Sequence, residues 1–579
     1  MESLPKHLQK YVVEQNYQKY TPVEQASWRY ILRQLKSFLS KHAHESYVEG
    51  LEKTGISVEN IPRIEDISNK LKQFGWRAIP VSGFIPPAAF MELQSLGVLP
   101  IASDMRTLDH LLYTPAPDIV HEAAGHAPIL IQPEFAEYLR QYAQVAKKAI
   151  ISKEDIEMYE AIRGLSDLKE AAASTAEQIA AAVIRLDEVT KSMGHVSEAA
   201  ELGRMNWWTA EYGLIGDLKN PKLFGAGLLS SVGEAKFCLS DQVKKIPLSV
   251  DCIHQSYDIT EKQPQLYVTP NFETLTEVLN QMADQMAVRR GGLISLQKAL
   301  KAESVNTVQL NSGIQISGII SEVLSPPHPS QEIAYLKFKG PSQLSFAENE
   351  LRGHGIEYHF EGFGTPIGKL KKFPSICPSK LSDNQWDALD AAPGKTMHLE
   401  FVSGVIVTGT FNGRVEQDQS TILLSLTEAK ATFNGKVLFD PSWGTYDIAI
   451  GSNVPSVFGG PADRMNYGET EDFVAARIPQ RQYSESEKSF HSQYAKVRDL
   501  RERNVQGAEL EKMLSSVLQT HENNFGEDWL LILEIYELLK NRAPSAEILT
   551  VVIAKLTEIS KKNENVAPMI QDGITHAQF

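Results

Sequence analysis

Residues 113–128 read YTPAPDIVHEAAGHAP, and this segment decides how the N-terminal half of the chain is interpreted. Thr114 and Pro115 predict the cap and first turn of a helix, because threonine accepts hydrogen bonds from free backbone amides and proline tolerates the first helical position. Gly125 and Pro128 predict where the helix ends. We therefore expect a short helix that carries two histidines near its end.

The two histidines, His121 and His126, are five residues apart. On a straight α-helix this spacing separates them by about 140°, so we expect the helix to end or loosen near Gly125. The spacing also differs from the HExxH motif of zinc proteases, whose histidines share one helix face. Two imidazoles suit Fe, Zn, Cu or Ni, and adding one carboxylate gives a set typical of iron(II) oxygenases. Without an acidic third ligand, the pair is as readily explained as hydrogen-bonded and chemically idle.

A candidate for that carboxylate occurs in residues 206–215, NWWTAEYGLI. Glu211 is the acidic residue of this otherwise aromatic and apolar helical segment. Burying an unpaired carboxylate is costly, so metal coordination and a salt bridge to an arginine would each explain it. The residues alone leave both explanations open.

The length of 579 residues predicts two to four domains, because one hydrophobic core rarely organises so long a chain. Residues 1–300 are predicted to form a mainly α domain, with an exposed alanine-rich helical insertion at 167–200. Residues 301–465 carry short β-branched runs that predict an all-β small barrel or sandwich of unknown role. Residues 466–579 return to a helical pattern with an apolar stripe. We expect this helical tail to pack on the body or, in a homo-oligomer, on another subunit.

Two similar segments punctuate the β-rich region: TFNGRV at residues 410–415 and TFNGKV at residues 432–437. Asn-Gly supplies the positive φ angles of a type I′ turn, so each segment predicts a β-hairpin. No catalytic constellation is expected in this region.

Composition restricts the class of protein. The formal net charge of -15 disfavours binding to nucleic acid and to anionic membranes. The three cysteines, Cys238, Cys252 and Cys377, are widely spaced and favour a reducing compartment over a disulfide framework. We find neither a signal peptide nor a long apolar run, and we expect a cytoplasmic protein.

Several motifs in order resemble the aromatic amino acid hydroxylase family, and within it the bacterial phenylalanine 4-monooxygenases. The resemblance spans about residues 20–290, and its motifs are WRAIPVSGFIPPAAF (76–90), the two segments quoted above, FGAGLLSSVGE (224–234), FCLS (237–240) and QPQLYV (263–268). Motifs in sequence order are far more specific than any one alone. The resemblance implies a phenylalanine hydroxylase that uses Fe(II), a tetrahydropterin (tetrahydrobiopterin or a bacterial analogue) and O2 as co-substrate.

By this resemblance, the iron ligands are His121, His126 and Glu211. Ser230 matches the serine that supports the first histidine from behind, as hydrogen bonds of this kind fix imidazole orientation. A buried serine satisfied by the backbone alone is the alternative.

The resemblance also implies the substrate-binding residues. Arg106 matches the arginine that binds the carboxylate of the amino acid, and Asp118 the acid that orients it. Thr114 and Ser231 match further contacts on the substrate side. Outside the motifs, an arginine and an aspartate at this spacing would more often form a surface salt bridge.

The pterin is implied to lie along the loop at Gly83, Phe84 and Ile85, to stack on Phe90 and to contact Glu122. Taken alone, Phe90 is more typical of a hydrophobic core.

The sequence departs from the family at Ala123 and Ala124, where the usual motif reads HELLGH, and at Asn206, where relatives carry a tyrosine near the iron. Two alternatives remain open. One is a tryptophan or tyrosine hydroxylase of the same family, and the other is a non-catalytic aromatic amino acid sensor.

Overall fold

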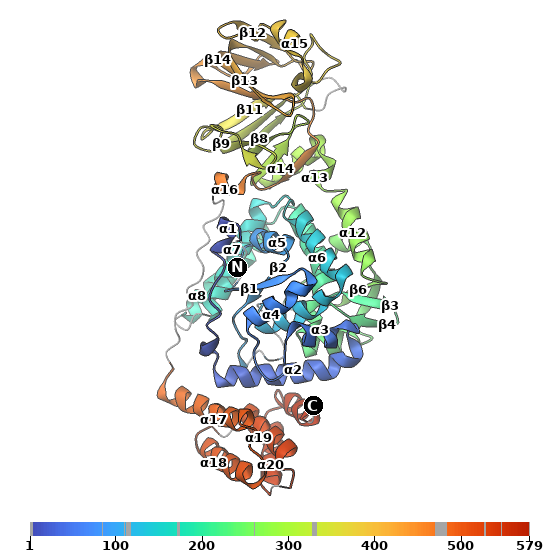
Figure 1. Ribbon diagram of the computed structural model, residues 1–579, viewed down its shortest axis with the longest axis vertical. Coiled ribbons are helices and arrows are strands. Elements are labelled where there is room, and N and C mark those ends of the chain that lie inside the picture. The colour runs from blue at the N-terminus through green and yellow to red at the C-terminus, as the bar shows by residue number, and fades with distance from the viewer. Residues whose placement is uncertain are drawn as a thin grey trace.

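The computed structural model describes residues 4–83, 85–108, 111, 117–170, 174–259, 261–326, 333–468, 483–525, 528–545 and 547–577. The described chain is elongated (Figure 1): strands of the β-rich region lie at one end, a mixed central part follows, and the C-terminal helices lie at the other end.

The central part is mainly helical. Helix α2 begins with a capping box, in which Thr21 and Glu24 satisfy each other's backbone amides and Pro22 takes the first helical position. The helices of the central part are α1 (Lys6–Gln9), α2 (Pro22–His42), α3 (Ser46–Thr54), α4 (Ile64–Leu71), α5 (Pro87–Ser95), α6 (Pro133–Ala146), α7 (Lys153–Glu170), α8 (Ala176–Ser192), α9 (Glu198–Asn206), α10 (Ala226–Leu229), α11 (Val232–Cys238), α12 (Glu273–Ala283), α13 (Ala287–Arg290) and α14 (Gly292–Ala302).

Two small sheets complete the central part. Strands β1 (Arg77–Val81) and β2 (Val98–Ala102) form a parallel pair. The second sheet has the order β4-β3-β6-β5, with β3 (Leu214–Asp217), β4 (Asn220–Leu223), β5 (Lys244–Pro247) and β6 (Gln265–Thr269).

In the alanine-rich segment, α7 and α8 pack against each other. A capping box of Thr175 and Gln178 starts α8, and none of its side chains is buried. Since α8 buries nothing, this pair of helices adds little to the hydrophobic core.

The β-rich region contains two antiparallel sheets. The first has the order β10-β9-β8-β7-β17, with β11 also pairing with β9; its strands are β7 (Val305–Gln309), β8 (Ile314–Leu324), β9 (Tyr335–Phe346), β10 (Asn349–Glu350), β11 (Gly362–Pro366) and β17 (Ser456–Gly459). The second has the order β12-β13-β14-β15, with β16 also pairing with β14; its strands are β12 (Thr396–Glu400), β13 (Ile406–Gln417), β14 (Ser420–Phe433), β15 (Lys436–Phe439) and β16 (Tyr446–Ala449). Apolar side chains of both sheets share buried clusters.

Of the two predicted hairpin turns, one is confirmed and one is wrong. Asn434 and Gly435 have φ angles of 49° and 80° and connect β14 to β15. Gly413, in contrast, lies inside β13, where the register shifts in a β-bulge. The chain turns later, at Asp418 and Gln419, which both have positive φ angles. The β-bulge accommodates Gly413 within β13, so the strand continues beyond this residue.

Helix α16 (Arg464–Tyr467) lies beside the β-rich region (Figure 1), where the hydroxyl of Tyr467 donates to the carbonyl oxygen of Pro341 at 2.9 Å. The C-terminal helices are α17 (Glu485–Glu502), α18 (Gly507–Phe525), α19 (Trp529–Arg542), α20 (Ile548–Lys562) and α21 (Ala567–His576). Helices α17, α19 and α21 contact α2, so one apolar cluster extends from the central part into the C-terminal helices. Buried Arg29 of α2 pairs with buried Glu534 of α19. Among the described residues, no helix is both long and apolar enough to cross a membrane.

Candidate active site and metal centre

The helix that carries the two histidines begins later than predicted. Residues 117 and 118 are not helical, and the helix starts at Ile119. The predicted cap at Thr114 and Pro115 is therefore wrong, although these two residues themselves lie outside the described part of the chain. Asp118 provides the cap instead, because its Oδ1 accepts a hydrogen bond of 3.0 Å from the backbone amide of His121.

The histidine segment, Val120–His126, is a π-helix. Backbone hydrogen bonds in a π-helix join residues five apart, so the two histidines come to lie one above the other. The ring centroids of His121 and His126 are 5.0 Å apart. The expectation that the helix loosens near Gly125 is confirmed, and the loosening covers the whole segment.

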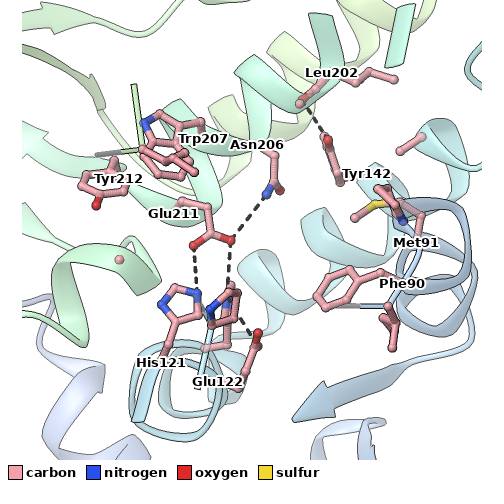
Figure 2. Close-up of a pocket in the computed structure, with 18 of the residues that line it drawn as sticks. Phe90, Met91, His121, Glu122, Tyr142, Leu202, Asn206, Trp207, Glu211 and Tyr212 are labelled. Carbon is pink, nitrogen blue, oxygen red and sulfur yellow. Dashed lines mark hydrogen bonds and ion pairs between the residues drawn. The ribbon is translucent and has the colours of Figure 1, made fainter. Parts of the chain in front are cut away.

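Glu211 ends a second π-helical segment, Trp207–Glu211. Figure 2 shows its carboxylate lying between His121 on one side and Asn206 on the other. Oε2 of Glu211 lies 3.3 Å from Nε2 of His121, and Oε1 lies 3.3 Å from Nε2 of His126. The partners of this buried carboxylate are thus the two histidines, together with Asn206, whose Nδ2 lies 3.5 Å from Oε1.

Electrostatics keeps Glu211 ionised. Burial alone would raise the pKa of this carboxyl, but the charges and hydrogen bonds of His126 and His121 lower it well below its usual value. The three residues each offer one ligand atom, and these atoms lie within 4.8 Å of one another. Two imidazole nitrogens and one carboxylate oxygen facing a common point fit an iron(II) centre with open coordination positions.

Ser230 holds His121 from the side away from Glu211. Its Oγ lies 3.1 Å from Nδ1 of His121 and donates a hydrogen bond of 2.8 Å to the carbonyl oxygen of Ala226. Since the hydroxyl proton is used on Ala226, Nδ1 of His121 donates to Ser230. The lone pair of Nε2 is then free to bind a metal ion.

Arg106 and Asp118 form a buried pair. Nε and Nη2 of Arg106 donate to the two carboxylate oxygens, each at 2.7 Å. Burial raises the pKa of the Asp118 carboxyl, but the charge and hydrogen bonds of Arg106 outweigh this and lower it. Nη1 of Arg106 donates to the carbonyl oxygen of Ser230 at 3.4 Å. The guanidinium is therefore fixed beside the histidine segment.

These residues surround a cavity of about 450 Å³, within the range of small-molecule sites. The structure brings nine of the predicted site residues to its wall: Ile85, Phe90, Arg106, His121, Glu122, His126, Glu211, Ser230 and Ser231.

Two predicted site residues, Asp118 and Gly83, do not line that wall, and two others cannot be placed there. Asp118 lies behind Arg106. Gly83 has a φ angle of 57°, and its amide donates to Oδ2 of Asp104 at 3.4 Å. Phe84 and Thr114 lie outside the described residues.

Glu122 is buried beside the histidines (Figure 2). Burial raises the pKa of its carboxyl to about 8. Its Oε2 lies 3.9 Å from Nε2 of His126 and has no hydrogen-bond partner among the described residues. The carboxyl group is thus available to a ligand in the cavity.

An aromatic wall of the cavity was not predicted from the sequence. Trp207 stacks between Tyr212 and Tyr257, at centroid distances of 4.5 and 4.3 Å. Tyr142 also lines the cavity, and its hydroxyl donates to the carbonyl oxygen of Leu202 at 2.8 Å. Trp207 belongs to the same quoted segment as Glu211, so its place in the site could have been predicted from the sequence. Tyr142 and Tyr257 lie outside every quoted motif.

A second group of potential metal ligands, His354, His359 and Asp447, comes together in the β-rich region. Asp447 is distant in sequence from both histidines, so no local pattern could predict this group.

Comparison with known proteins gives three kinds of match. The model of the biopterin-dependent aromatic amino acid hydroxylase family matches residues 9–162 and 184–315, leaving out part of α7 and α8. The phenylalanine-4-hydroxylase of Mesorhizobium japonicum is 31% identical over 282 residues, which are 48% of this chain and 86% of the relative. That of Pseudomonas aeruginosa is 27% identical over 45% of this chain and 82% of the relative. That of Dictyostelium discoideum is 30% identical over 46% of this chain and 51% of the relative, about half its length.

A crystal structure of Chromobacterium violaceum phenylalanine hydroxylase with bound oxidised Fe(III) aligns at 23% identity and a TM-score of 0.38, over 48% of this chain and 87% of that one.

Proposed function

Because the chain belongs to the biopterin-dependent aromatic amino acid hydroxylase family, we propose that it hydroxylates L-phenylalanine to L-tyrosine with O2, a tetrahydropterin and a non-haem iron(II) centre. The observation that carries this proposal is the meeting of His121, His126 and Glu211 at the wall of one cavity. Phenylalanine is favoured as the substrate because the similar curated relatives are phenylalanine-4-hydroxylases.

The iron ligands are Nε2 of His121, Nε2 of His126 and the carboxylate of Glu211. Bound iron and pterin together supply the activation of O2 and the two reducing equivalents of the reaction. Ser230 keeps the imidazole of His121 in the orientation and tautomer needed for binding. Asn206 restrains the carboxylate of Glu211 from the opposite side.

Arg106 binds the carboxylate of the amino acid. Among the described residues, Asp118 and Ser230 use three of its five N–H donors, which leaves two for the substrate. Asp118 is a positioning residue, because it fixes the plane of the guanidinium and balances its charge in a buried place. Ser231, which lines the cavity, and Thr114 complete the substrate side of this proposal.

The tetrahydropterin lies on the side of Phe90, where the ring stacks on the aromatic face and the backbone of Gly83, Phe84 and Ile85 runs beside it. Burial raises the pKa of the Glu122 carboxyl to about 8, which favours its neutral form. A neutral carboxyl both donates and accepts hydrogen bonds, which suits the mixed donors and acceptors of a pterin ring.

The aromatic wall excludes water from the reacting groups. Trp207 and Tyr257 line the cavity, and their mutual stacking at 4.3 Å keeps them in place. A water-poor cavity strengthens the interaction of Arg106 with the substrate carboxylate.

The test is formation of tyrosine from phenylalanine by the purified full chain with Fe(II) and a tetrahydropterin. We expect His121→Ala and Glu211→Gln to abolish turnover and to lose iron, while the control His398→Ala, on an exposed face of β12, keeps both. Product from tryptophan or tyrosine in preference to phenylalanine would contradict the substrate. An iron-loaded, folded chain without product from any of the three would favour the amino acid sensor.

For the rest of the chain, we propose a catalytic domain at residues 1–300 that contains the helical insertion 167–200, a β-sandwich domain at 301–465, and a C-terminal helical region at 466–579. The shared apolar clusters of the two β-sheets support the sandwich. We place the protein in the cytoplasm as a possible homo-oligomer through its C-terminal helices, with free Cys238, Cys252 and Cys377 supporting a reducing compartment.

A further inference from the structure

The group of His354, His359 and Asp447 lies far in sequence from the proposed active site. The two histidines belong to residues 351–361, the loop between β10 and β11 of the first sheet. Asp447 belongs to β16 of the second sheet, opposite Ser425 of β14. The group therefore joins the two sheets of the β-rich region.

The loop is held in place by its backbone. The amide of His354 donates to the carbonyl oxygen of Leu351 at 2.9 Å, and the amide of Leu344 donates to the carbonyl oxygen of His354 at 2.9 Å. His359 forms an isolated bridge with Ser342 of β9. The histidines are thus positioned by strand β9 and do not depend on a ligand for their arrangement.

The distances are compatible with a shared metal ion. Nδ1 of His354 lies 3.2 Å from Nε2 of His359, and each of the three residues offers a ligand atom within 4.8 Å of the others. Two ligands of a tetrahedral Zn²⁺ ion, each at about 2.0–2.1 Å, are about 3.3 Å apart. The imidazole rings are inclined by 21° to each other, with centroids 5.4 Å apart.

Burial supports this reading. His359 and Asp447 are 7% and 4% exposed. A buried carboxylate needs a cation or several donors. Among the described residues, Asp447 accepts a hydrogen bond from the hydroxyl of Tyr358, whose side chain is 54% exposed.

We propose that His354, His359 and Asp447 bind a divalent transition metal ion, with Zn²⁺ favoured by the spacing of the two nitrogens, and that this ion links the loop 351–361 to β16. Three protein ligands leave a coordination position for water. The side chains of Tyr358 and Phe360, the two neighbours of His359 in this loop, are exposed, so the group lies close to the surface. The competing explanation is a direct N–H···N hydrogen bond between two neutral histidines.

The experiment uses the full chain carrying His121→Ala and Glu211→Gln, which silences the proposed iron site. After removal of metal with a chelator, Co²⁺ is added as a spectroscopic probe and then displaced by Zn²⁺. We expect about one ion per chain, with visible absorption bands typical of a low-coordinate cobalt site, and a higher midpoint of thermal unfolding with Zn²⁺.

Adding His359→Ala or the nearly isosteric Asp447→Asn should abolish the bound ion, its spectrum and the thermal shift. Adding His398→Ala is the matched control. This histidine belongs to the same region, is exposed, and forms a side-chain hydrogen bond with Thr408. Absence of Co²⁺ and Zn²⁺ binding in the parent, or binding that survives both substitutions, would overturn the proposal in favour of the hydrogen-bonded pair. Tighter retention of Fe²⁺ than of Zn²⁺ would overturn the assignment to zinc. None of these results depends on catalytic activity.

Discussion

Arg106 and Asp118 meet through two parallel hydrogen bonds of 2.7 Å, with the arginine 6% and the aspartate 4% exposed. Truncating one partner of such a pair leaves an uncompensated buried charge. If the guanidinium of Arg106 is displaced, the substrate carboxylate that it is proposed to bind is displaced with it.

Asp118→Asn is therefore expected to raise the KM for phenylalanine on the order of tenfold or more, because about 1.4 kcal/mol of lost binding corresponds to each factor of ten. Iron content should not change, since the asparagine oxygen can still cap the amide of His121. The comparison is Glu137→Gln, which removes a half-exposed ion pair with Arg140 and should leave KM unchanged. Equal KM values for native chain and Asp118→Asn would count against the positioning role.

Ser230→Ala removes the group that fixes His121. Loss of such a hydrogen bond to a ligand typically costs 10–100-fold in metal affinity, and we expect a fall of that size in Fe(II) affinity, measured by competition with a chelator. Ser95→Ala is the control, because Ser95 also donates to a helix carbonyl, that of Glu92 at 2.7 Å, without touching a histidine. Iron affinity unaltered by Ser230→Ala would mean that the serine is satisfied by the backbone alone.

Gly125→Ala should distort the histidine segment. A Cβ atom at this position would lie 2.6 Å from the carbonyl oxygen of Ala226, the same oxygen that accepts the hydroxyl proton of Ser230. Backbone must shift to relieve this contact, at a cost of about 1–3 kcal/mol. We expect a lower midpoint of thermal unfolding together with weaker iron binding.

Its counterpart is Gly164→Ala in the exposed face of α7, where a Cβ atom meets nothing within 4 Å. Alanine is the better helix former, so this change should raise stability by about 0.5–1 kcal/mol. A Gly125→Ala protein as stable and as rich in iron as the native chain would refute the close-packing argument.

Glu534→Gln tests the junction between α2 and the C-terminal helices. Glu534 pairs with Arg29 and, at 3.1 Å, with Arg501, and both arginines are buried or nearly so. Removing the charge should destabilise the protein by about 3–5 kcal/mol, seen as a lower unfolding midpoint. Glu558→Gln, which affects an exposed pair with Lys562, should not alter the midpoint.

The same junction gives a pH dependence with a definite sign. Burial raises the pKa of Glu534, but Arg29 and Arg501 outweigh it and bring the pKa down to about 2, from 4.5. A depressed folded-state pKa contributes stability that is complete above about pH 4.5 and is lost as the pH falls towards 2. The difference in unfolding midpoint between native chain and Glu534→Gln should thus be largest at pH 7 and shrink between pH 4.5 and 3. A difference independent of pH would exclude the ion pair as its source.

Local patterns predicted what local physics controls. The Asn434-Gly435 turn follows from two residues that tolerate positive φ, and the broken helix near Gly125 follows from the spacing of two histidines. The π-helical form could not be predicted, because it depends on packing against Ala226 of α10. The turn at Asp418 and Gln419 was missed because a β-bulge absorbed the more obvious glycine.

Local sequence patterns could not predict contacts between residues that are distant in the sequence. Nothing near His354 or His359 indicates that Asp447 will lie opposite them, since strand order in the two sheets decides it. The stacking of Tyr257 on Trp207 is decided in the same way, by where a loop returns.

Arg29 lies 505 residues before Glu534, and this separation constrains the order of events during synthesis. A ribosome adding about 5–20 residues per second needs roughly 25–100 s to make the intervening chain. Through that interval Arg33 can pair, among the described residues, only with Glu59, at 3.3 Å, and burying Arg29 without Glu534 would be costly. We expect the inner face of α2 to stay hydrated, or bound by a chaperone, until α19 leaves the ribosome.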